Sequence, residues 1–419
     1  MLGFAALVLS LAATLTAPNV AIFPWLILGL VALGDVFVSA KRGLGLDVDF
    51  PEEIFVGEAG ELRLALNKKI QNMTGAIDWP DGLSGPAEFA FASDEGHNVA
   101  TVSMRTTRRG HWRLDKTWLT WPTRFGLFEF LAQRNLGAEI SVVPNVRPIQ
   151  SGEIATTVLS TLYGIKENRA IGEGSEFHQL REFAPGMDVN MIDWKRSARR
   201  RSLLAKELRA ERNHHVILAI DNGYLMREEV GGLPKIDHAI NAALATAWAA
   251  AMGGDLVGYF SYDARPTSFV APSPGRIAFA RMRSWSAGLD YVSRASNHTL
   301  ALSTLKARTP KRSLIIVFTD FVDATSAELI VETIGLLAKK HLVIFVAIRD
   351  PELEARAEAP PEQLNDVAAL VAASQLISER RIVFERLSRL GVAVLDVRPG
   401  EVTARLVTAY LDIKSREMI

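Results

Sequence analysis

Two aspartates stand where parallel strands of a predicted α/β sheet end. Asp221 directly follows the apolar run HHVILAI, and Asp320 follows SLIIVFT. The carboxyl ends of parallel strands meet at one edge of a sheet, so we expect the two carboxylates to be neighbours there. A known site of this kind binds a hard divalent cation such as Mg²⁺, which prefers oxygen ligands. Its pattern is Asp-x-Ser-x-Ser after the first strand, a Thr in a middle loop and an Asp after the fourth strand.

This predicted metal site is incomplete. Asp221 matches the first loop, but Gly223 and Leu225 stand where the two serines should be, and neither carries a side-chain oxygen. Thr299 is the candidate oxygen of the middle loop, and Asp320 is the candidate last ligand. Because two direct ligands are missing, the favoured interpretation is that Asp221 and Asp320 cap loops and helix starts. We expect weak or no Mg²⁺ binding and no other cofactor.

A second group of carboxylates lies in the polar stretch of residues 172–221. Glu173, Glu176, Asp188 and Asp193 could act as the acids and bases of a hydrolase, which is the enzymatic alternative. No nucleophile or cofactor motif accompanies them, since the chain contains no G-x-x-x-x-G-K-[ST], H-E-x-x-H or G-x-S-x-G sequence. The favoured interpretation is a non-enzymatic protein without catalytic residues or a small-molecule substrate.

The segment from Lys195 to Arg212 is strongly basic. It holds eight basic and two acidic residues, which gives a net charge of +6 (8 − 2). Anionic lipid, an acidic protein partner, or internal pairing with Glu182, Asp188 and Asp193 would each neutralise it. Internal pairing combined with contact to a protein partner is the favoured interpretation, and nucleic acid is not expected.

The elements that position these residues change along the chain. In residues 213–419, unbroken apolar strands alternate with amphipathic helices, which predicts a mostly parallel sheet covered on both faces. Residues 46–148 contain short strands with alternating or β-branched apolar residues, typical of a β-sandwich. Residues 149–212 show few strand signals. We interpret them as a connector that braces the two domains, with Trp194 as its anchor.

Residues 1–43 are predicted to form a transmembrane helical hairpin. Residues 2–17 are an apolar stretch of 16, and residues 20–40 are a second stretch of 21 whose only charge is Asp35. A cleaved signal peptide is the alternative for the first stretch. The basic pair at 41–42 favours a cytoplasmic location for both ends of the hairpin. We therefore predict a multi-pass protein of the inner (cytoplasmic) membrane with its soluble domains in the cytoplasm.

Composition narrows the class of protein further. The chain has 419 residues with 47 basic and 47 acidic side chains, a formal net charge of zero and no cysteine. A neutral chain is not typical of a whole-chain nucleic-acid binder. Without cysteine, disulfides, thiolate metal sites and a cysteine nucleophile are excluded. The length favours two or three domains.

The block GEGSEFHQLREFAPGMDVNMIDWKRSAR, residues 172–199, resembles the signature of the bacterial domain-of-unknown-function family fifty-eight. In that family G-x-G-x-E-F is followed by L-R-x-[YF]-x-P-G-D-D-x-R-x-I-[DN]-W and then by S-A-R. Met187 and Asn190 depart from this pattern. The matching residues to which we assign a partner-binding or structural role are Glu176, Arg181, Asp188, Asp193, Trp194 and Arg199.

The resemblance implies a membrane-anchored cytoplasmic protein with a von Willebrand factor A-like domain that works beside a MoxR-type AAA+ ATPase. Such pairs are thought to act in chaperone-like maturation or assembly of client proteins. It follows that the chain is an adaptor or scaffold. The alternatives are the carboxylate-based hydrolase and a cell-envelope scaffold that is independent of an ATPase.

Overall fold

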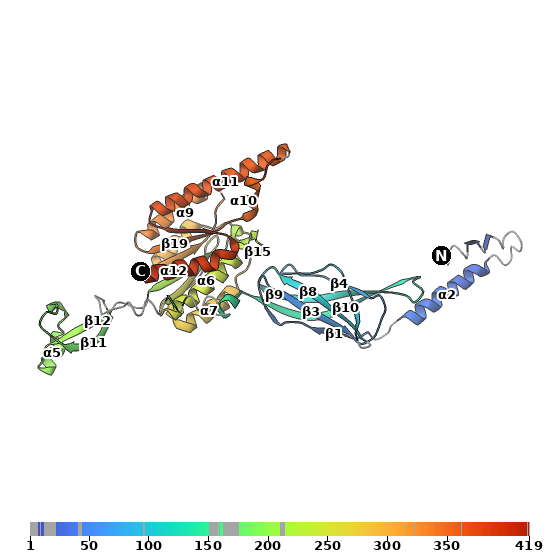
Figure 1. Cartoon of the computed structure of the whole chain (residues 1–419), viewed down its shortest axis with the longest axis horizontal. Coiled ribbons are helices and arrows are strands. Elements are labelled where there is room, and N and C mark those ends of the chain that lie inside the picture. Colours follow the sequence, from blue (N-terminus) through green and yellow to red (C-terminus); the bar gives the residue numbers. More distant parts are fainter. Residues whose placement is uncertain are drawn as a thin grey trace. The chain divides into compact units, whose positions relative to one another are not determined.

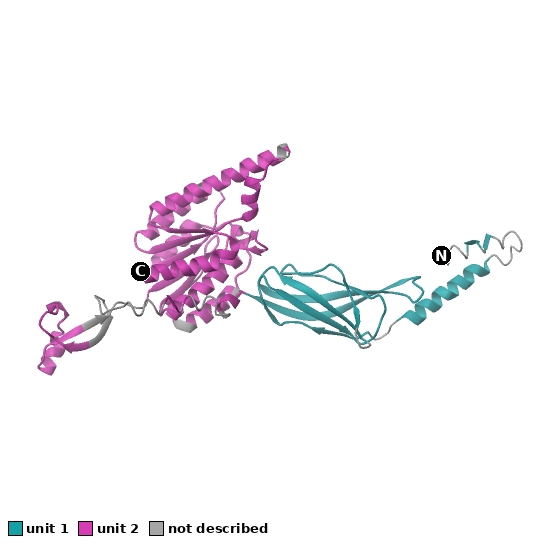
Figure 2. Ribbon diagram, viewed as in Figure 1, with its two compact units in different colours: residues 1–143 teal, residues 144–419 magenta. Residues whose placement is uncertain are grey.

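The computed structural model contains a β-rich part and an α/β part (Figure 1), which fall into two compact units, residues 1–143 and 144–419 (Figure 2). Each unit is considered by itself. The described residues are 7–8, 10–11, 22–40, 44–94, 97–150, 158, 160–161, 176–209, 214–322, 324–361, 363–416 and 418.

Unit 1 is a β-sandwich preceded by helix α2 (Phe23–Ser39). One sheet has the strand order β1-β3-β8-β5, with β7 also paired to β8, and the other has the order β2-β10-β9-β4-β6. The strands are β1 (Leu46–Asp49), β2 (Glu53–Phe55), β3 (Ala59–Leu66), β4 (Thr74–Ile77), β5 (Leu83–Ser84), β6 (Phe89–Ala90), β7 (Ala92–Asp94), β8 (His97–Thr106), β9 (Gly110–Pro122) and β10 (Glu129–Val143).

Alternating side chains build the interior of the sandwich. Along β8 every second residue is buried, as a strand with one face on a core requires. Leu66 of β3 and Met73 pack in one cluster with Leu119 and Trp121 of β9, so the two sheets share a core. Strand pairing is mixed, because β2 runs parallel to β10.

The predicted membrane hairpin lies partly outside the described residues. Of its first stretch only residues 7–8 and 10–11 are described, and they are helical. The second stretch contains α2, which is 17 residues long. Across the ranges given above, no helix combines the length and the apolar character needed to cross a bilayer.

Unit 2 is built on a six-stranded sheet with the order β17-β16-β13-β18-β19-β20. Neighbouring strands are parallel except at the edge, where β17 runs antiparallel to β16. The chain order reverses at β13, the first strand, and at such a point of an open α/β sheet the loops after neighbouring strands turn to opposite faces. The strands are β13 (His215–Asp221), β16 (Leu256–Tyr262), β17 (Pro266–Pro274), β18 (Leu314–Phe318), β19 (Leu342–Ile348) and β20 (Ala393–Val397).

Helices cover both faces of this sheet, as the strand pattern predicted (Figure 1). α6, α7 and α12 pack together, whereas α8, α9 and α11 share a core with the sheet residues Ile217, Phe260 and Phe345. The helices are α6 (Lys235–Met252), α7 (Gly275–Ala287), α8 (His298–Arg308), α9 (Ala324–Ala338), α10 (Pro351–Glu358), α11 (Leu364–Arg389) and α12 (Val402–Ser415). A small hairpin of β14 (Glu229–Val230) and β15 (Leu233–Pro234) precedes α6.

The predicted connector contains more regular structure than its sequence indicated. Helix α3 (Arg147–Gln150) opens it, and β11 (Glu176–Glu182) pairs antiparallel with β12 (Leu204–Arg209). Helix α5 (Trp194–Arg200) lies between the two strands in sequence. The hairpin escaped prediction because EFHQLRE and LAKELR are rich in charged residues and carry little apolar alternation.

Candidate functional site

Asp221 ends β13 and is almost fully buried, with 1% of its surface exposed. One carboxylate oxygen, Oδ1, accepts hydrogen bonds from the backbone N–H of Gly223 (2.8 Å) and from the hydroxyl of Ser296. The other, Oδ2, accepts from the hydroxyl of Thr319 at 2.6 Å and lies 4.0 Å from Nδ1 of His298. Burial raises the pKa of Asp221, and the charge of a protonated His298 and these donors offset that effect only in part.

Ser296 occupies the space that a side chain at position 223 would need. A Cβ built on Gly223 would collide with the Ser296 hydroxyl oxygen, which leaves room for glycine only. The middle loop therefore does place an oxygen beside Asp221, but it comes from Ser296. Thr299, the residue we predicted for that role, lies exposed in the first turn of α8. Leu225 lies half-buried in a short 3₁₀ turn.

Asp320 follows β18 and is held by two cations. Its Oδ2 lies 2.7 Å from Nζ of Lys235, and its Oδ1 accepts from Nη1 of Arg380 at 2.5 Å and from the backbone N–H of Phe321 at 2.9 Å. Lys235 begins α6, is buried, and also contacts Oε2 of Glu228 at 2.7 Å.

The charges of neighbouring side chains explain the pKa shifts of Asp320 and Lys235. Burial alone would raise the pKa of Asp320, but Arg380 and Lys235 outweigh it and hold the pKa below its ordinary value. Burial likewise would lower the pKa of Lys235, and its pKa is raised because Asp320 and Glu228 outweigh that effect. The ammonium of Lys235 and the carboxylate of Asp320 are therefore charged at neutral pH.

This arrangement does not fit a divalent cation. A metal ion bound by Asp320 would meet the ammonium of Lys235 and the guanidinium of Arg380, both already paired with that carboxylate. In the described part of the chain, no group of three or more His, Asp or Glu side chains is arranged to hold a metal. Both the incomplete first loop and the cations around Asp320 therefore make a poor site for a divalent cation.

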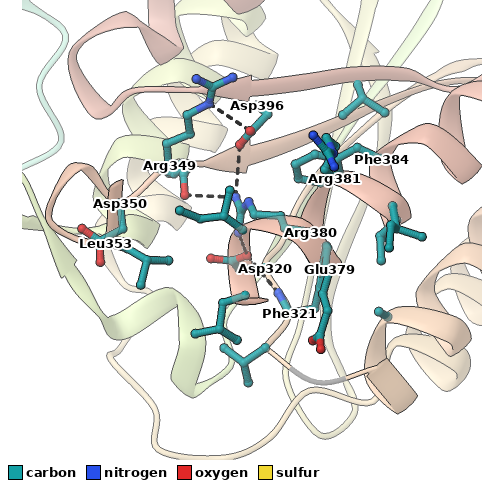
Figure 3. Close-up of a pocket in the computed structure, with 18 of the residues that line it drawn as sticks. Asp320, Phe321, Arg349, Asp350, Leu353, Glu379, Arg380, Arg381, Phe384 and Asp396 are labelled. Carbon is teal, nitrogen blue, oxygen red and sulfur yellow. Dashed lines mark hydrogen bonds and ion pairs between the residues drawn. The ribbon is translucent and has the colours of Figure 1, made fainter. Parts of the chain in front are cut away.

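The ion pairs continue across the sheet edge (Figure 3). Arg380 of α11 also donates to the carbonyl of Ile348 (3.2 Å) and to Asp396 (3.3 Å), and Asp396 accepts from Nε of Arg349 at 2.9 Å. The guanidinium of Arg380 lies over the ring of Phe384, 5.2 Å from its centroid. Arg380 thereby ties α11 to the ends of β18, β19 and β20.

A pocket of about 850 Å³ opens beside these ion pairs (Figure 3). It lies where β18, β19 and β20 end, under α11 and next to the start of α10. Most of its exposed lining is apolar. Its charged lining residues are Glu228, Lys235, Asp320, Glu328, Arg349, Asp350, Glu354, Glu379, Arg380, Arg381, Arg386 and Asp396. The apolar lining residues are Phe321, Val322, Ala327, Ile348, Leu353, Leu376, Ile377, Ile382, Val383, Phe384 and Val394.

The signature residues lie in and near the β11–β12 hairpin. Asp188 accepts the backbone N–H of Asn190 at 2.9 Å, and Asp193 caps α5 by accepting the backbone N–H of Arg196 at 3.0 Å. Trp194, the predicted anchor of the connector between the two domains, is 64% exposed.

Of the other residues singled out in this block, Arg181 and Arg199 are exposed. Glu176 is the first residue of β11, and its side chain lies outside the described part. Glu173 also lies outside the described residues, as does the glycine-rich start of the block. The carboxylates of the hydrolase alternative that are described, Asp188 and Asp193, bind backbone amides.

Sequence reasoning missed the residues that dominate the sheet edge, namely Lys235, Ser296 and Arg380. One signal was available for Arg380, a single arginine on the face of α11 that carries Val383 and Leu387 into the core. Lys235 follows a proline at a helix start, where a basic residue opposes the helix dipole and calls for a carboxylate nearby. Nothing in the sequence marks Ser296 above its neighbours.

Comparisons with solved structures found distant similarities over about half of the chain. The conserved hypothetical protein BatB from Bacteroides thetaiotaomicron is 16% identical, covering 49% of this chain and 100% of that one, with a TM-score of 0.32. The vWF domain of the type V pili tip protein Mfa5 from Porphyromonas gingivalis is 11% identical, covering 49% and 96%, with a TM-score of 0.27. A search of curated protein sequences found no match. Residues 179–369 match the family model described as "Protein of unknown function DUF58", in agreement with the resemblance drawn from the signature block.

Proposed function

We propose that the chain is a membrane-anchored, non-enzymatic adaptor whose α/β unit binds a segment of a partner protein in the pocket at the carboxyl edge of the sheet. The observation that carries this proposal is the pocket itself, about 850 Å³ in volume, with a largely apolar exposed lining and with Lys235 and Arg380 already paired with Asp320. Ligands of open α/β sheets bind at this edge.

The lining favours a protein segment over a small charged ligand. Apolar side chains from separate helices, such as Leu353 of α10 and Leu376 of α11, line the same pocket. They would gain most from apolar side chains of a partner. Because Lys235, Arg380 and Arg349 are engaged by carboxylates of the chain itself, they are poorly placed to bind a phosphate or a carboxylate ligand.

We infer that this binding is independent of a metal ion, because Lys235 and Arg380 already neutralise Asp320. A hydrolase is less well supported, since Asp188 and Asp193 accept backbone N–H groups in a capping role. The partner that the family resemblance implies is a MoxR-type AAA+ ATPase. Proteins matured by that ATPase would be the clients.

Anchoring at the cytoplasmic membrane is part of the proposal. Helix α2 exposes nearly all of its apolar side chains and buries only Asp35 and Ser39. An exposed apolar helix of this kind calls for an apolar environment.

The test is capture of the ATPase from membranes that contain the full chain and a co-expressed MoxR-type ATPase. Leu376→Arg places a charge in the apolar wall of the pocket and is expected to abolish capture. Val371→Arg makes the same change at an exposed position of α11 outside the pocket lining, and capture is expected to persist. Repeated failure of the wild-type chain to capture the ATPase, or equal capture by both variants, would count against the proposal.

A further inference from the structure

Helix α2 buries polar side chains and exposes apolar ones. Its two buried residues are polar, Asp35 (2% exposed) and Ser39 (7% exposed). A surface helix in water shows the opposite arrangement, with apolar residues inside and polar residues outside. The exposed apolar residues of α2 are Phe23, Trp25, Leu26, Ile27, Leu30, Val31, Leu33, Phe37 and Val38.

The polar pair of α2 binds a loop of the sandwich. Oδ1 of Asp35 accepts the backbone N–H of Phe125 at 3.1 Å, and Oγ of Ser39 accepts the backbone N–H of Arg124 at 2.9 Å. Ser39 also donates to Asp35 at 3.3 Å. The only charge in the apolar helix is therefore used to fix the loop between β9 and β10 against its last turns.

The loop is held in one shape by its own hydrogen bonds. The backbone N–H and the hydroxyl of Thr123 both donate to the carbonyl of Phe128, at 2.8 and 3.0 Å. The backbone N–H of Gly126 donates to the carbonyl of Thr123 at 2.9 Å, and Gly126 has a φ of +67° that favours glycine. This turn presents Phe125 and Phe128, which are 63% and 50% exposed, and Leu131, which is 68% exposed, lies just beyond it at the start of β10.

We infer that this loop is a membrane contact in which Phe125, Phe128 and Leu131 enter the interfacial region of the bilayer that holds α2. The inference rests on the membrane anchoring in the proposed function. Asp35 lies four residues before Ser39, so the loop contacts the helix over about 6 Å of its length, at a rise of about 1.5 Å per residue. Phe125 is therefore expected to lie at about the same depth in the bilayer as the last turns of α2.

Lipid is the occupant that the surroundings favour. The exposed apolar surface of the loop continues into that of α2, where Phe37 and Val38 are 81% and 63% exposed. Aromatic side chains are enriched where a bilayer meets water. The exposed Arg124 stands beside Phe125 and would face anionic headgroups. A second copy of the chain would have to surround α2 to bury the same exposed apolar side chains.

The chain offers a clean experiment because it contains no cysteine. Single cysteines replace Phe125, Phe128 or Leu131 in the full chain and are labelled with an environment-sensitive fluorophore. The labelled chains are reconstituted into vesicles of phosphatidylcholine and phosphatidylglycerol, with or without nitroxide-bearing lipids. Glu139→Cys is the matched control, since it is an exposed position of the same strand β10, far from the loop. Leu30→Cys reports on α2 itself.

Lipid nitroxides are expected to quench the label at 125, 128 and 131 severalfold more strongly than the label at 139. If the label at 30 is quenched and those in the loop resemble the label at 139, the loop contact is overturned and the anchor stands. If the label at 30 is also unquenched, the anchor itself is wrong. Loop labels that respond to protein density in the vesicle but not to lipid nitroxides would assign the surface to a second copy and overturn the lipid contact.

Discussion

Asp221 and Asp320 follow neighbouring parallel strands at the same edge of one sheet, and both are buried, yet the groups around them differ in charge. Asp221 meets hydroxyls, a backbone N–H and an imidazole, whereas Asp320 meets an ammonium and a guanidinium. The pKa of Asp221 is raised and the pKa of Asp320 is lowered. Because Asp221 and Asp320 lie at the same edge of the sheet, the charge of their partners decides whether the pKa is raised or lowered.

The difference shows how the chain's own side chains stabilise the carboxylates at this sheet edge. Hydroxyl donors satisfy the oxygens of Asp221 but leave part of the cost of burying its charge uncompensated. Lys235 and Arg380 compensate that cost at Asp320, because each places a positive charge within 2.7 Å of the carboxylate. We infer that these two side chains supply the positive charge that a divalent cation would supply in the complete site.

Removing the ammonium is expected to have the largest effect. Lys235→Met keeps most of the side-chain volume but leaves Asp320 with Arg380 as its only cation and Glu228 without its partner. We expect the free energy of unfolding to fall by about 3–5 kcal/mol, the usual cost of breaking a buried ion pair. Chemical denaturation of the full chain in detergent measures this. The matched control is Lys340→Met at an exposed position, with a change of about 0.5 kcal/mol or less. Equal effects of the two variants would contradict the role of Lys235.

On the Asp221 side the critical feature is space. Gly223→Ala places a methyl group against the hydroxyl of Ser296, and overpacking of this kind costs about 1–3 kcal/mol. Ser296→Ala in the same chain removes the obstructing oxygen and is expected to recover part of the loss. Denaturation of the two single variants and the double variant gives the coupling energy, expected to be about 0.5 kcal/mol or more. Strictly additive losses would show that Ser296 does not fill the place of a side chain at 223.

The opposite pKa shifts predict opposite dependences of stability on pH. The folded pKa of Asp320 lies below its ordinary value of 3.8. The stabilisation from its ion pairs is therefore present above 3.8 and lost as the pH falls through the folded pKa. The folded pKa of Asp221 lies above 3.8, so the folded chain keeps a proton that the unfolded chain has released, and its contribution falls as the pH rises through that folded pKa.

Urea denaturation at a series of pH values separates the two carboxylates. Asp320→Asn is expected to lack part of the acid loss of stability, and Asp221→Asn is expected to lack the fall above pH 3.8. Each unit of pKa shift corresponds to about 1.4 kcal/mol. Identical pH profiles for the two variants would mean that the two sites do not differ in the way their surroundings indicate.

The α/β unit was largely predictable from the sequence. The runs HVILAID, LIIVF and LVIFVAI are continuous and apolar because parallel strands are buried on both faces, and they form β13, β18 and β19. Strand β17 was missed because it is an edge strand with intermediate burial and a proline at each end. Helix α10 was missed because it is short, charged and has no buried residue.

The site was predictable only in its two aspartates, whose place at strand ends follows from the strand pattern. Their side-chain partners come from residues 60 to 98 positions away, as in the pairs of Asp320 with Lys235 and Arg380 and of Asp221 with Thr319. Such contacts depend on tertiary packing and leave no local periodicity. The choice of Thr299 over Ser296 failed for the same reason, because Thr299 lies exposed in the first turn of α8, three positions after the residue that contacts Asp221.

Calorimetric titration of the full chain with Mg²⁺ tests most directly whether Lys235 and Arg380 take the place of a divalent cation. We expect no micromolar affinity, and no rise in the free energy of unfolding when Mg²⁺ is present at millimolar concentration. A site of micromolar affinity would add about 4 kcal/mol under those conditions. Micromolar binding that disappears in Asp221→Ala would contradict this account, because it would show a working metal site at the sheet edge.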